Sequence, residues 1–344
     1  MTSITPAPLP RFILDFETTG LDPATDQVLE VGLRGADTLD ALVSDARPAS
    51  PAAAEVHGLD PDLCRCLGRP SAEVLGDLLA RLGPGPVEVV AHNASFERRF
   101  LEAWAAREGR GLPEIRWHCT LERAWALAPK APFSCRLGAL AELFGWPTEG
   151  LHGAGMDATL TGRLVDVLDA WTAVRDRLGP EPGLVYLAGP FRGDGSAEVM
   201  AHNRARMAGL ARWAQAVLPD ATLMVPHLNF AYADEAGKHG DRIRAQVLRS
   251  CEALVARCHA LIQCGSHRTE GVAREIAAAQ ARGIPVLQVS GWPSLKREPG
   301  HEVKGVARGG GSFVCPKARK VLLPDGTYPC MGIPGRSSFI SLRR

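Results

Sequence analysis

Residues 11–23 read RFILDFETTGLDP, and this stretch decides how the first half of the chain is interpreted. Its apolar residues alternate with charged ones, which is typical of a β-strand with one buried face. Because side chains alternate along a strand, Asp15 and Glu17 share one face while Phe16 points to the other. Neighbouring carboxylates repel each other unless a cation lies between them, so this strand end suggests a Mg²⁺ or Mn²⁺ site. Two solvated acids at the end of a strand are the alternative.

Two further segments bring acidic residues to the starts of expected helices. Glu97 lies near the start of a helix expected at 94–107, and Asp157 near the start of one expected from about 155 to 178. His152 lies in the loop before that second helix and could swing over the site. Three or four carboxylates with a mobile histidine are what two-metal phosphodiester hydrolysis needs, the histidine taking the proton of the attacking water.

These segments resemble the motifs of the DEDDh 3′–5′ exonucleases, the family of proofreading subunits with an RNase H-like fold. The first motif is ILDFETTGLDP at 13–23, the second AHNASFERRFL at 91–101, and the third HGAGMDA at 152–158. A further family feature, His-Gly followed by an aliphatic residue, is HGL at 57–59. The resemblance covers about residues 10–175, with the motifs in the family's order and spacing.

The resemblance implies a role for each matching residue. His152 would be the general base, and Thr18 would contact the terminal nucleotide. His92 and Asn93 would help to shape the site. Four residues would be ligands of two Mg²⁺ or Mn²⁺ ions: Asp15, Glu17, Glu97 and Asp157.

Glu97 departs from the family pattern, which normally has Asp at this position. Glutamate keeps the charge but adds a methylene group, so it can still bind a metal directly or through water. It can also change the metal preference or slow the enzyme, because Mg²⁺ demands near-ideal geometry. A second interpretation therefore makes the first half an impaired nuclease that serves as a nucleic-acid-binding module.

The organisation of the chain changes at residues 179–183, a linker with two prolines and two glycines. Strands and helices then alternate strictly, which predicts a parallel sheet with helices on both faces. We therefore expect an α/β protein with an RNase H-like mixed-sheet domain at 10–178 and a doubly wound parallel-sheet domain at 184–290. An irregular, weakly ordered basic tail is expected at 291–344, with one hairpin around Asp325-Gly326.

A glycine-rich turn and a helical glutamate mark the second domain. The segment VYLAGPFRGDG at 185–195 reads as a strand, a turn and a helix start, where backbone N–H groups attract anions. Glu275 is expected one turn into a helix, at the edge of the parallel sheet where ligands bind. A carboxylate there could attack an anomeric carbon. An ordinary βα turn and a solvated glutamate are the alternatives.

Together these residues resemble the nucleoside 2-deoxyribosyltransferase-like superfamily, and within it the DUF4406 branch. The resemblance implies cleavage of the N-glycosidic bond of nucleosides or their monophosphates. Glu275 would be the nucleophile and Tyr186 would orient it. The residues that would hold the 5′-phosphate are Gly189, Arg192 and Gly193.

Cys251 is a departure from this second pattern. Related enzymes usually place an acidic residue about 24 positions before the nucleophile, whereas this chain has Cys251 there and Glu252 beside it. Glu252 could substitute for the acid after a one-residue shift. A nucleotide-binding domain without catalysis, which localises or regulates the nuclease, is the alternative.

Composition and charge agree with two soluble modules. The 344 residues are 46% hydrophobic with a net charge of +1, yet residues 1–170 carry −9 and the remainder +10. An acidic half can hold metal ions and a basic half can hold phosphates. No apolar run approaches the ~20 residues of a membrane span, and no secretory signal is visible. The nine scattered cysteines are interpreted as reduced thiols, so we expect a cytoplasmic protein without membrane contact.

The leading hypothesis is a metal-dependent 3′–5′ exonuclease that releases nucleoside 5′-monophosphates from single-stranded or frayed 3′ ends. The sequence does not decide between DNA and RNA. The second domain would take a nucleoside monophosphate, the type of product that the first domain makes, and could form a homo-oligomer. The alternative function is an N-glycosidase or deoxyribosyltransferase whose nuclease domain only binds nucleic acid.

Overall fold

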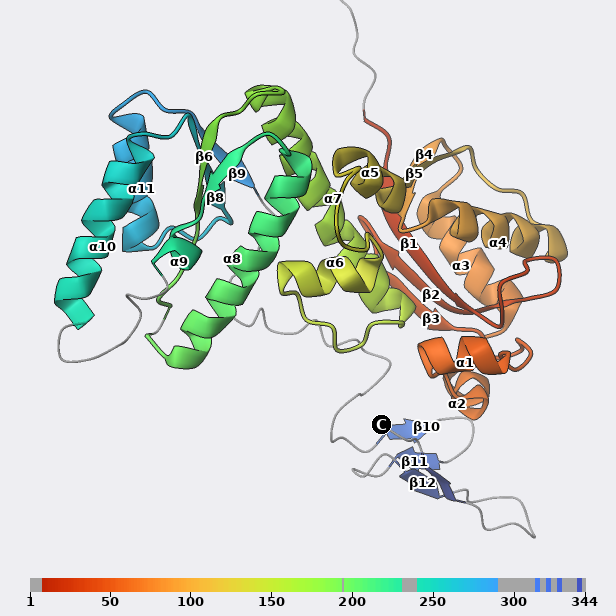
Figure 1. Ribbon diagram of the computed structural model, residues 1–344. Helices are drawn as coiled ribbons and strands as arrows, with labels where there is room; N and C mark the ends of the chain where they lie inside the picture. Colours follow the sequence, from red (N-terminus) through yellow and green to blue (C-terminus); the bar gives the residue numbers. More distant parts are fainter. Residues whose placement is uncertain are drawn as a thin grey trace, which may run out of the picture. The chain divides into compact units, whose positions relative to one another are not determined.

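The computed structural model describes residues 8–193, 195–230 and 240–289, and four short strands nearer the C-terminus. The chain divides into two compact units (Figure 1). Among the described residues, the first comprises 8–119 and 150–162 with the four C-terminal strands, and the second comprises 120–149, 163–193, 195–230 and 240–289. The boundary passes through the long helix α7 (Ala154–Leu178), which contributes its first turns to one unit and the rest to the other.

A mixed five-stranded sheet forms the centre of the first unit. Strand β1 (Arg11–Thr18) lies in the middle of the order β3-β2-β1-β4-β5. The neighbours β2 (Val28–Arg34) and β3 (Leu39–Leu42) continue it as an antiparallel meander. On the other side β4 (Val87–Ala91) and β5 (Ile115–Cys119) run parallel to β1. The predicted mixed sheet is confirmed.

The alternation along β1 divides its residues between a core and a site. Phe12, Leu14 and Phe16 are buried in one hydrophobic cluster with helices α3 (Ser71–Leu82) and α4 (Ala94–Arg107). The Phe16 ring meets the Trp104 ring edge-on, with centroids 6.0 Å apart. Asp15 and Glu17 consequently lie on the opposite face, as the period of two predicts.

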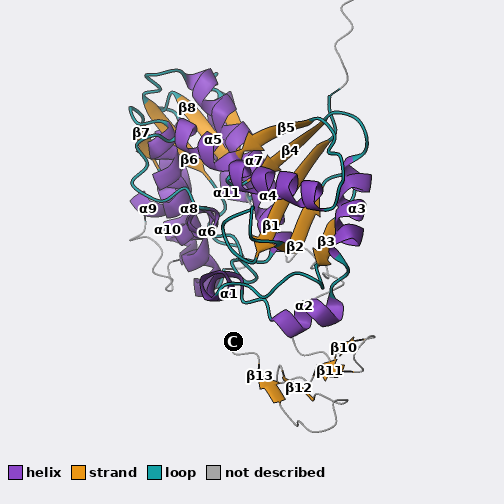
Figure 2. Ribbon diagram, turned by 90° about the vertical axis from the view of Figure 1, so that its right-hand side faces the viewer, coloured by secondary structure: helices purple, strands orange, loops and turns teal. Residues whose placement is uncertain are grey.

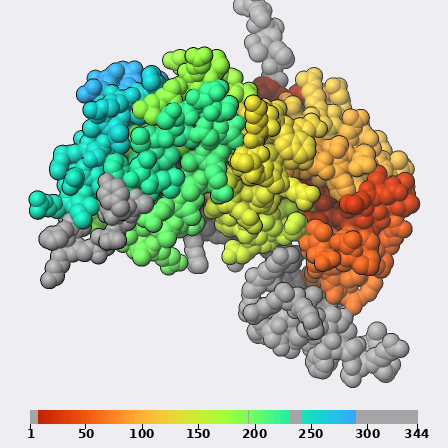
Figure 3. Space-filling view, viewed as in Figure 1, coloured from red at the N-terminus to blue at the C-terminus, as the bar shows by residue number. Residues whose placement is uncertain are grey.

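Two short helices, α1 (Pro51–His57) and α2 (Pro61–Leu67), were not predicted from periodicity. Each begins with proline after a capping side chain, Ser50 or Asp60. The loop after β1 is tied to this region, because the Ser50 N–H donates to the Thr19 carbonyl at 2.7 Å. In space-filling view this loop, in red, reaches the surface beside α1 (Figure 3).

The second unit contains a four-stranded parallel sheet of order β7-β6-β8-β9. Figure 2 labels three of its strands, β6, β7 and β8. This arrangement confirms the predicted doubly wound architecture. The strands are β6 (Leu184–Ala188), β7 (Thr222–Met224), β8 (Ala260–Cys264) and β9 (Val286–Val289). The helices after β6 are α8 (Ala197–Val217), α9 (Pro226–Asn229), α10 (Gly240–Val255) and α11 (Glu270–Gln280).

Helices α5 (Thr120–Leu127) and α6 (Leu137–Phe144) belong to the second unit by their packing. α6 lies against α8, where the Phe144 and Trp213 rings meet edge-on at 5.5 Å. The backbones approach so closely that a Cβ at Gly209 would stand 1.8 Å from the Leu143 carbonyl oxygen. Only glycine permits this contact, which joins a helix expected in the first domain to helix α8 of the second.

Four short strands are described near the C-terminus. β10 (Phe313–Cys315) pairs with β11 (Lys320–Leu322), and β12 (Thr327–Pro329) pairs with β13 (Phe339–Ser341). The rest of the expected tail, including the predicted hairpin turn at Asp325-Gly326, lies outside the described residues. Among the helices that the structure describes, none is both long and apolar enough to span a bilayer.

Candidate active site

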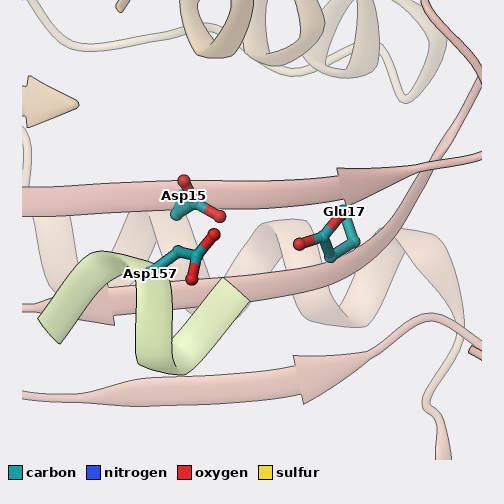
Figure 4. Close-up of side chains that lie close together, drawn as sticks. All are labelled: Asp15, Glu17 and Asp157. Carbon is teal, nitrogen blue, oxygen red and sulfur yellow. The ribbon is translucent and has the colours of Figure 1, made fainter. Parts of the chain in front are cut away.

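Three carboxylates from two elements meet beside the first sheet. Asp15 and Glu17 extend from β1 toward Asp157, which extends from the first turn of α7 (Figure 4). One ligand atom from each residue lies within 4.8 Å of the others. Asp15 and Asp157 are only 8% and 9% exposed. Oxygen ligands at this spacing suit a hard divalent cation.

The electrostatics of this cluster favour binding of a cation. Burial raises the pKa of Glu17 to about 9 and that of Asp157 to about 6. The pKa of Asp15 is also raised well above its ordinary value, first by burial and then by the charges of Glu97 and Asp157. Buried like charges either retain protons or bind a cation that replaces those protons. The residues present therefore fit a divalent metal ion.

Glu97 lies close to this cluster without joining the three residues that are within 4.8 Å of one another. It is in the first turn of α4, is 4% exposed, and its Oε2 has no hydrogen-bond partner in the described structure. Burial raises the Glu97 pKa to about 8, and its charge raises the pKa of Asp15. A buried, unpartnered carboxylate oxygen is available to a ligand, but its role as the fourth metal ligand stays a prediction.

His152 lies in the loop immediately before α7, with an exposed side chain. Its backbone has a left-handed conformation with φ of 62°, and its N–H donates to Asp157 Oδ1 at 3.3 Å. The charge of His152 lowers the pKa of Asp157, in opposition to burial. The structure therefore brings His152 to the carboxylate cluster on an exposed loop.

The other residues predicted for the substrate lie at the ends of parallel strands. Thr18 ends β1, and its Oγ1 donates to the Gly20 carbonyl at 2.6 Å, which fixes the turn after the strand. His92 and Asn93 follow β4, and Asn93 caps α4 with φ of 79°, a conformation that asparagine tolerates. The contacts of these residues with a nucleotide stay predictions.

Sequence reasoning gave no role to Glu30, and it treated His57 only as part of a motif. Glu30 on β2 lies opposite Glu17, and its Oε2 accepts the Ala154 N–H at 3.0 Å. His57 ends α1, is 4% exposed, and accepts the Leu59 N–H at Nδ1. Burial lowers the His57 pKa, and the charge of His152 lowers it further. The contact between Glu30 and Ala154 joins residues 124 positions apart, so no local pattern could have revealed it.

A separate cavity of about 400 Å³ lies within the second unit. Glu275, from the second turn of α11, lines it and is 7% exposed. The Tyr186 hydroxyl donates to Glu275 Oε1 at 2.7 Å from the buried strand β6. The predicted loop residues also line the cavity: Gly189, Arg192 and Gly193.

Two buried side chains hold the loop that follows β6. Asn203 of α8 donates from Nδ2 to the Phe191 carbonyl at 2.8 Å. His227 of α9 pairs its Nε2 with the Pro190 carbonyl at 3.1 Å, and burial lowers the His227 pKa to about 4. A neutral imidazole that bonds to a carbonyl does so as a donor, so the loop is fixed from both sides.

Cys251, and not Glu252, faces the cavity. Glu252 forms an ion pair with Arg274 at 2.5 Å, whereas Cys251 lines the cavity and is 3% exposed. Burial raises the Glu275 pKa to about 7, while hydrogen bonds from Tyr186 and Cys251 lower it. The suggested one-residue shift to Glu252 is therefore wrong for this conformation, and the thiol occupies the place beside the glutamate.

Comparison with known proteins separates the two halves of the chain. Residues 12–165 match the family model described as Exonuclease, and residues 183–289 match a domain of unknown function, DUF7768. The DNA polymerase III PolC-type of Thermotoga maritima is 37% identical over 159 residues, covering 44% of this chain and 11% of that protein. The corresponding protein of Halalkalibacterium halodurans is 30% identical over 171 residues, covering 48% and 11%.

The chain therefore spans about a tenth of the length of the curated relatives it matches. The first match supports a nuclease hydrolase in residues 12–165. The second match carries no activity, so the resemblance of the second half to deoxyribosyltransferases stays a prediction.

Two solved structures align with about half of the chain. The zinc-bound complex of E. coli ExoI with single-stranded DNA aligns with a TM-score of 0.43 and 17% identity, covering 49% of this chain and 42% of that one. E. coli exonuclease I with a dA16 oligonucleotide aligns with a TM-score of 0.42 and 18% identity, over the same shares.

Proposed function

We propose that the first unit is a metal-dependent 3′–5′ exonuclease that removes nucleoside 5′-monophosphates from single-stranded or frayed 3′ ends of DNA. The observation that carries this proposal is the buried cluster of Asp15, Glu17 and Asp157 within a segment that matches the exonuclease family. We infer that two Mg²⁺ or Mn²⁺ ions bind there and that Glu97 completes the ligands.

The residues of the chain divide the work of hydrolysis. The carboxylates would hold the ions, and His152, on its exposed loop, would take a proton from the attacking water. Thr18, His92 and Asn93 position the terminal nucleotide at the strand ends. When bound, divalent ions supply Lewis-acid activation of that water and neutralise the charge that develops on the leaving oxygen.

A nuclease assay tests this proposal. Wild-type protein and Asp15→Ala are incubated with 3′- and 5′-labelled single-stranded DNA and RNA, with Mg²⁺, Mn²⁺ or a chelator. We expect stepwise shortening from the 3′ end that requires the metal and is lost in the variant, with DNA degraded faster than RNA. Failure of the wild-type protein to degrade any of these substrates would favour the binding-module interpretation, in which Glu97 disables the site.

We further propose that the cavity of the second unit binds a nucleoside monophosphate and cleaves its N-glycosidic bond. The specific observation in favour is a buried carboxylate, Glu275, held by the Tyr186 hydroxyl at the wall of a cavity. The loop with Gly189, Arg192 and Gly193 would hold the 5′-phosphate. The Glu275 carboxylate would attack the anomeric carbon, and the base would leave with the bonding electron pair and take a proton from solvent water. A second water would then hydrolyse the glycosyl ester and regenerate the carboxylate.

The full-length protein tests this second activity. Base release from each common deoxynucleoside and nucleoside monophosphate is followed by chromatography, beside the Glu275→Gln variant. Release that the variant abolishes supports the proposal, and release from none of the nucleotides refutes it. Nucleotide binding that raises the melting temperature without turnover would instead support a module that localises or regulates the nuclease. A homo-oligomer formed through this unit stays a prediction, which size-exclusion chromatography of the full-length protein tests.

A further inference from the structure

The first turn of α7 rests on three alternate residues of β2, namely Glu30, Gly32 and Arg34. Alternate residues of a strand share one face, so these three face the helix together. Glu30 Oε2 accepts the Ala154 N–H at 3.0 Å, and Arg34 Nη2 donates to the Gly155 carbonyl at 2.6 Å. We name these three residues the β2 clamp. The clamp thus binds one N–H and one carbonyl of the helix start.

Gly32, in the middle of the clamp, brings the two backbones into contact. A Cβ at this position would stand 2.1 Å from the Ala154 carbonyl oxygen, closer than real Cβ atoms come to any backbone atom. Any side chain here would push the helix away from the strand. The position of α7 is therefore set by backbone contact at Gly32 and by the charged residues Glu30 and Arg34 that flank it.

Arg34 is itself held in place, so it is a firm support for the helix. Its Nε donates to Thr159 Oγ1 at 2.9 Å, one turn further along α7. Its Nη1 forms an ion pair with Asp40 of β3 at 2.7 Å. The planar guanidinium thereby links two turns of α7 to two strands, which a lysine cannot do.

The clamp acts on the part of the helix that carries the proposed chemistry. Ala154 lies two residues after His152 and three before Asp157, and Glu30 is directly opposite Glu17 across the strands. A helix turn moves as a rigid body, so a shift at Ala154 also moves the Asp157 carboxylate relative to Asp15. Misplacement by about 1 Å can cost roughly 100-fold in rate at an active site.

We propose that Glu30 is a positioning residue for the metal site, acting through the Ala154 N–H to hold Asp157 and His152 against β1. The inference rests on the proposed exonuclease function. It assigns the Glu30 carboxylate to the start of α7, where a negative charge also suits the helix dipole. Glu30 therefore affects metal binding by positioning Asp157 and His152, and it is not itself a metal ligand.

The competing explanation is that Glu30 only adds negative charge near the cations. Two substitutions separate these explanations. Glu30→Gln removes the charge but keeps an oxygen that can accept the Ala154 N–H, whereas Glu30→Ala removes both. Glu88→Ala is the matched control, because Glu88 is a partly buried strand glutamate that pairs with Arg11 at 2.9 Å.

The experiment measures Mn²⁺ binding by calorimetry and exonuclease kinetics on 3′-labelled single-stranded DNA for the full-length variants. For Glu30→Ala we expect Mn²⁺ affinity to fall by about 10-fold and kcat by roughly 10- to 100-fold, the usual effect of removing an outer-shell partner. We expect KM for DNA to stay unchanged in Glu30→Ala. Glu30→Gln should recover most of both losses, and Glu88→Ala should match the wild-type protein.

Equal losses in Glu30→Gln and Glu30→Ala would overturn the proposal in favour of the charge explanation. Wild-type behaviour of Glu30→Ala would also overturn it. Gly32→Ala tests the same clamp without changing any charge, and it should impair Mn²⁺ binding at least as much while circular dichroism shows a folded protein. If Gly32→Ala binds Mn²⁺ like wild type, the clamp does not position the site. Glu30-dependent Mn²⁺ binding in a protein without nuclease activity would refute the proposed function and retain this inference.

Discussion

The carboxylates beside β1 and the Glu275 carboxylate of α11 are all buried, but their surroundings differ. Besides burial, the groups that raise the pKa values of Asp15 and Glu17 are other carboxylates. Glu275 instead receives hydrogen bonds from Tyr186 and Cys251, which lower its pKa against burial. The site beside β1 gathers several negative charges, whereas the Glu275 charge is stabilised by two hydrogen-bond donors.

This difference shows how one residue type can serve two kinds of chemistry. A cluster of like charges is costly without a cation, so the first site is suited to metal binding. A hydrogen-bonded carboxylate with a pKa of about 7 is partly ionised at neutral pH and can act as a nucleophile without a metal. The two sites should therefore respond independently to substitution, metal removal and pH.

The largest expected effect comes from breaking the first site alone. Asp15→Asn should reduce nuclease activity by more than roughly 100-fold, because it removes the charge of a central metal ligand. Loss of an outer-shell partner of a ligand costs up to about 100-fold. Nucleotide binding to the second unit should not change. Glu275→Gln is the reciprocal control and should leave nuclease activity at the wild-type level. A loss of nuclease activity in Glu275→Gln would show that the two sites are not independent.

A smaller loss is expected for the residue at the margin of the cluster. Glu97→Gln should lower nuclease activity by about 10- to 100-fold, since it removes a buried, unpartnered carboxylate oxygen near Asp15. Glu97→Asp should stay within about 10-fold of wild type because the charge is retained. Initial rates with Mg²⁺ and Mn²⁺ measure both effects. If Glu97→Asp instead raises activity from near zero, the natural glutamate disables the site.

The pH dependence of base release tests whether ionised Glu275 is the nucleophile and whether Tyr186 lowers its pKa. The ionised carboxylate is the attacking form, so activity should rise with pH through about 7. Tyr186→Phe removes a hydrogen bond that stabilises this form and should move the profile upward by on the order of 1 pH unit. Base release at about pH 7 should then fall several-fold, and by no more than about 10-fold. An unchanged profile would show that the phenol does not tune Glu275, and the nuclease profile serves as the control.

The smallest expected effect is on thermal stability. The Glu17 pKa is about 9 in the folded protein against 4.5 as its ordinary value, so the folded state binds more protons between these limits. The free energy of unfolding of the metal-free protein should therefore fall as pH rises through that window. Mn²⁺ should raise Tm by a few degrees, and more at about pH 8 than at about pH 6, because protons compete with the metal. Scanning fluorimetry measures these shifts. The same Tm shift at both pH values, or in Asp15→Asn, would contradict this interpretation.

The sequence predicts the elements whose signal is local and repeated. The period of two in β1 places Asp15 and Glu17 on one face, and the alternation after the linker predicts the parallel sheet of the second unit. The short helices α1 and α2 have only 7 residues each, too few for a helical period to show. Their capping residues and prolines were present in the sequence, so these signals could have found them.

Other features of the sites depend on contacts that only the folded chain makes. Glu30 lies in an apolar strand pattern that says nothing of Ala154, and the packing of α7 on β2 creates their hydrogen bond. Cys251 and Glu252 are adjacent in the sequence, and only the orientation of α10 decides which of them lines the cavity. Residue types and motifs thus indicate the chemistry, whereas tertiary packing selects the particular side chain.

The glycine contact between α6 and α8 has a consequence for protein engineering. A fragment that starts at the 179–183 linker loses α6 and leaves Trp213 and the flat surface at Gly209 in water, which invites aggregation. A fragment that starts near residue 120 keeps α6 but takes with it α7, and therefore Asp157. No single cut leaves both halves complete. Their activities are best separated by point substitutions in the intact polypeptide.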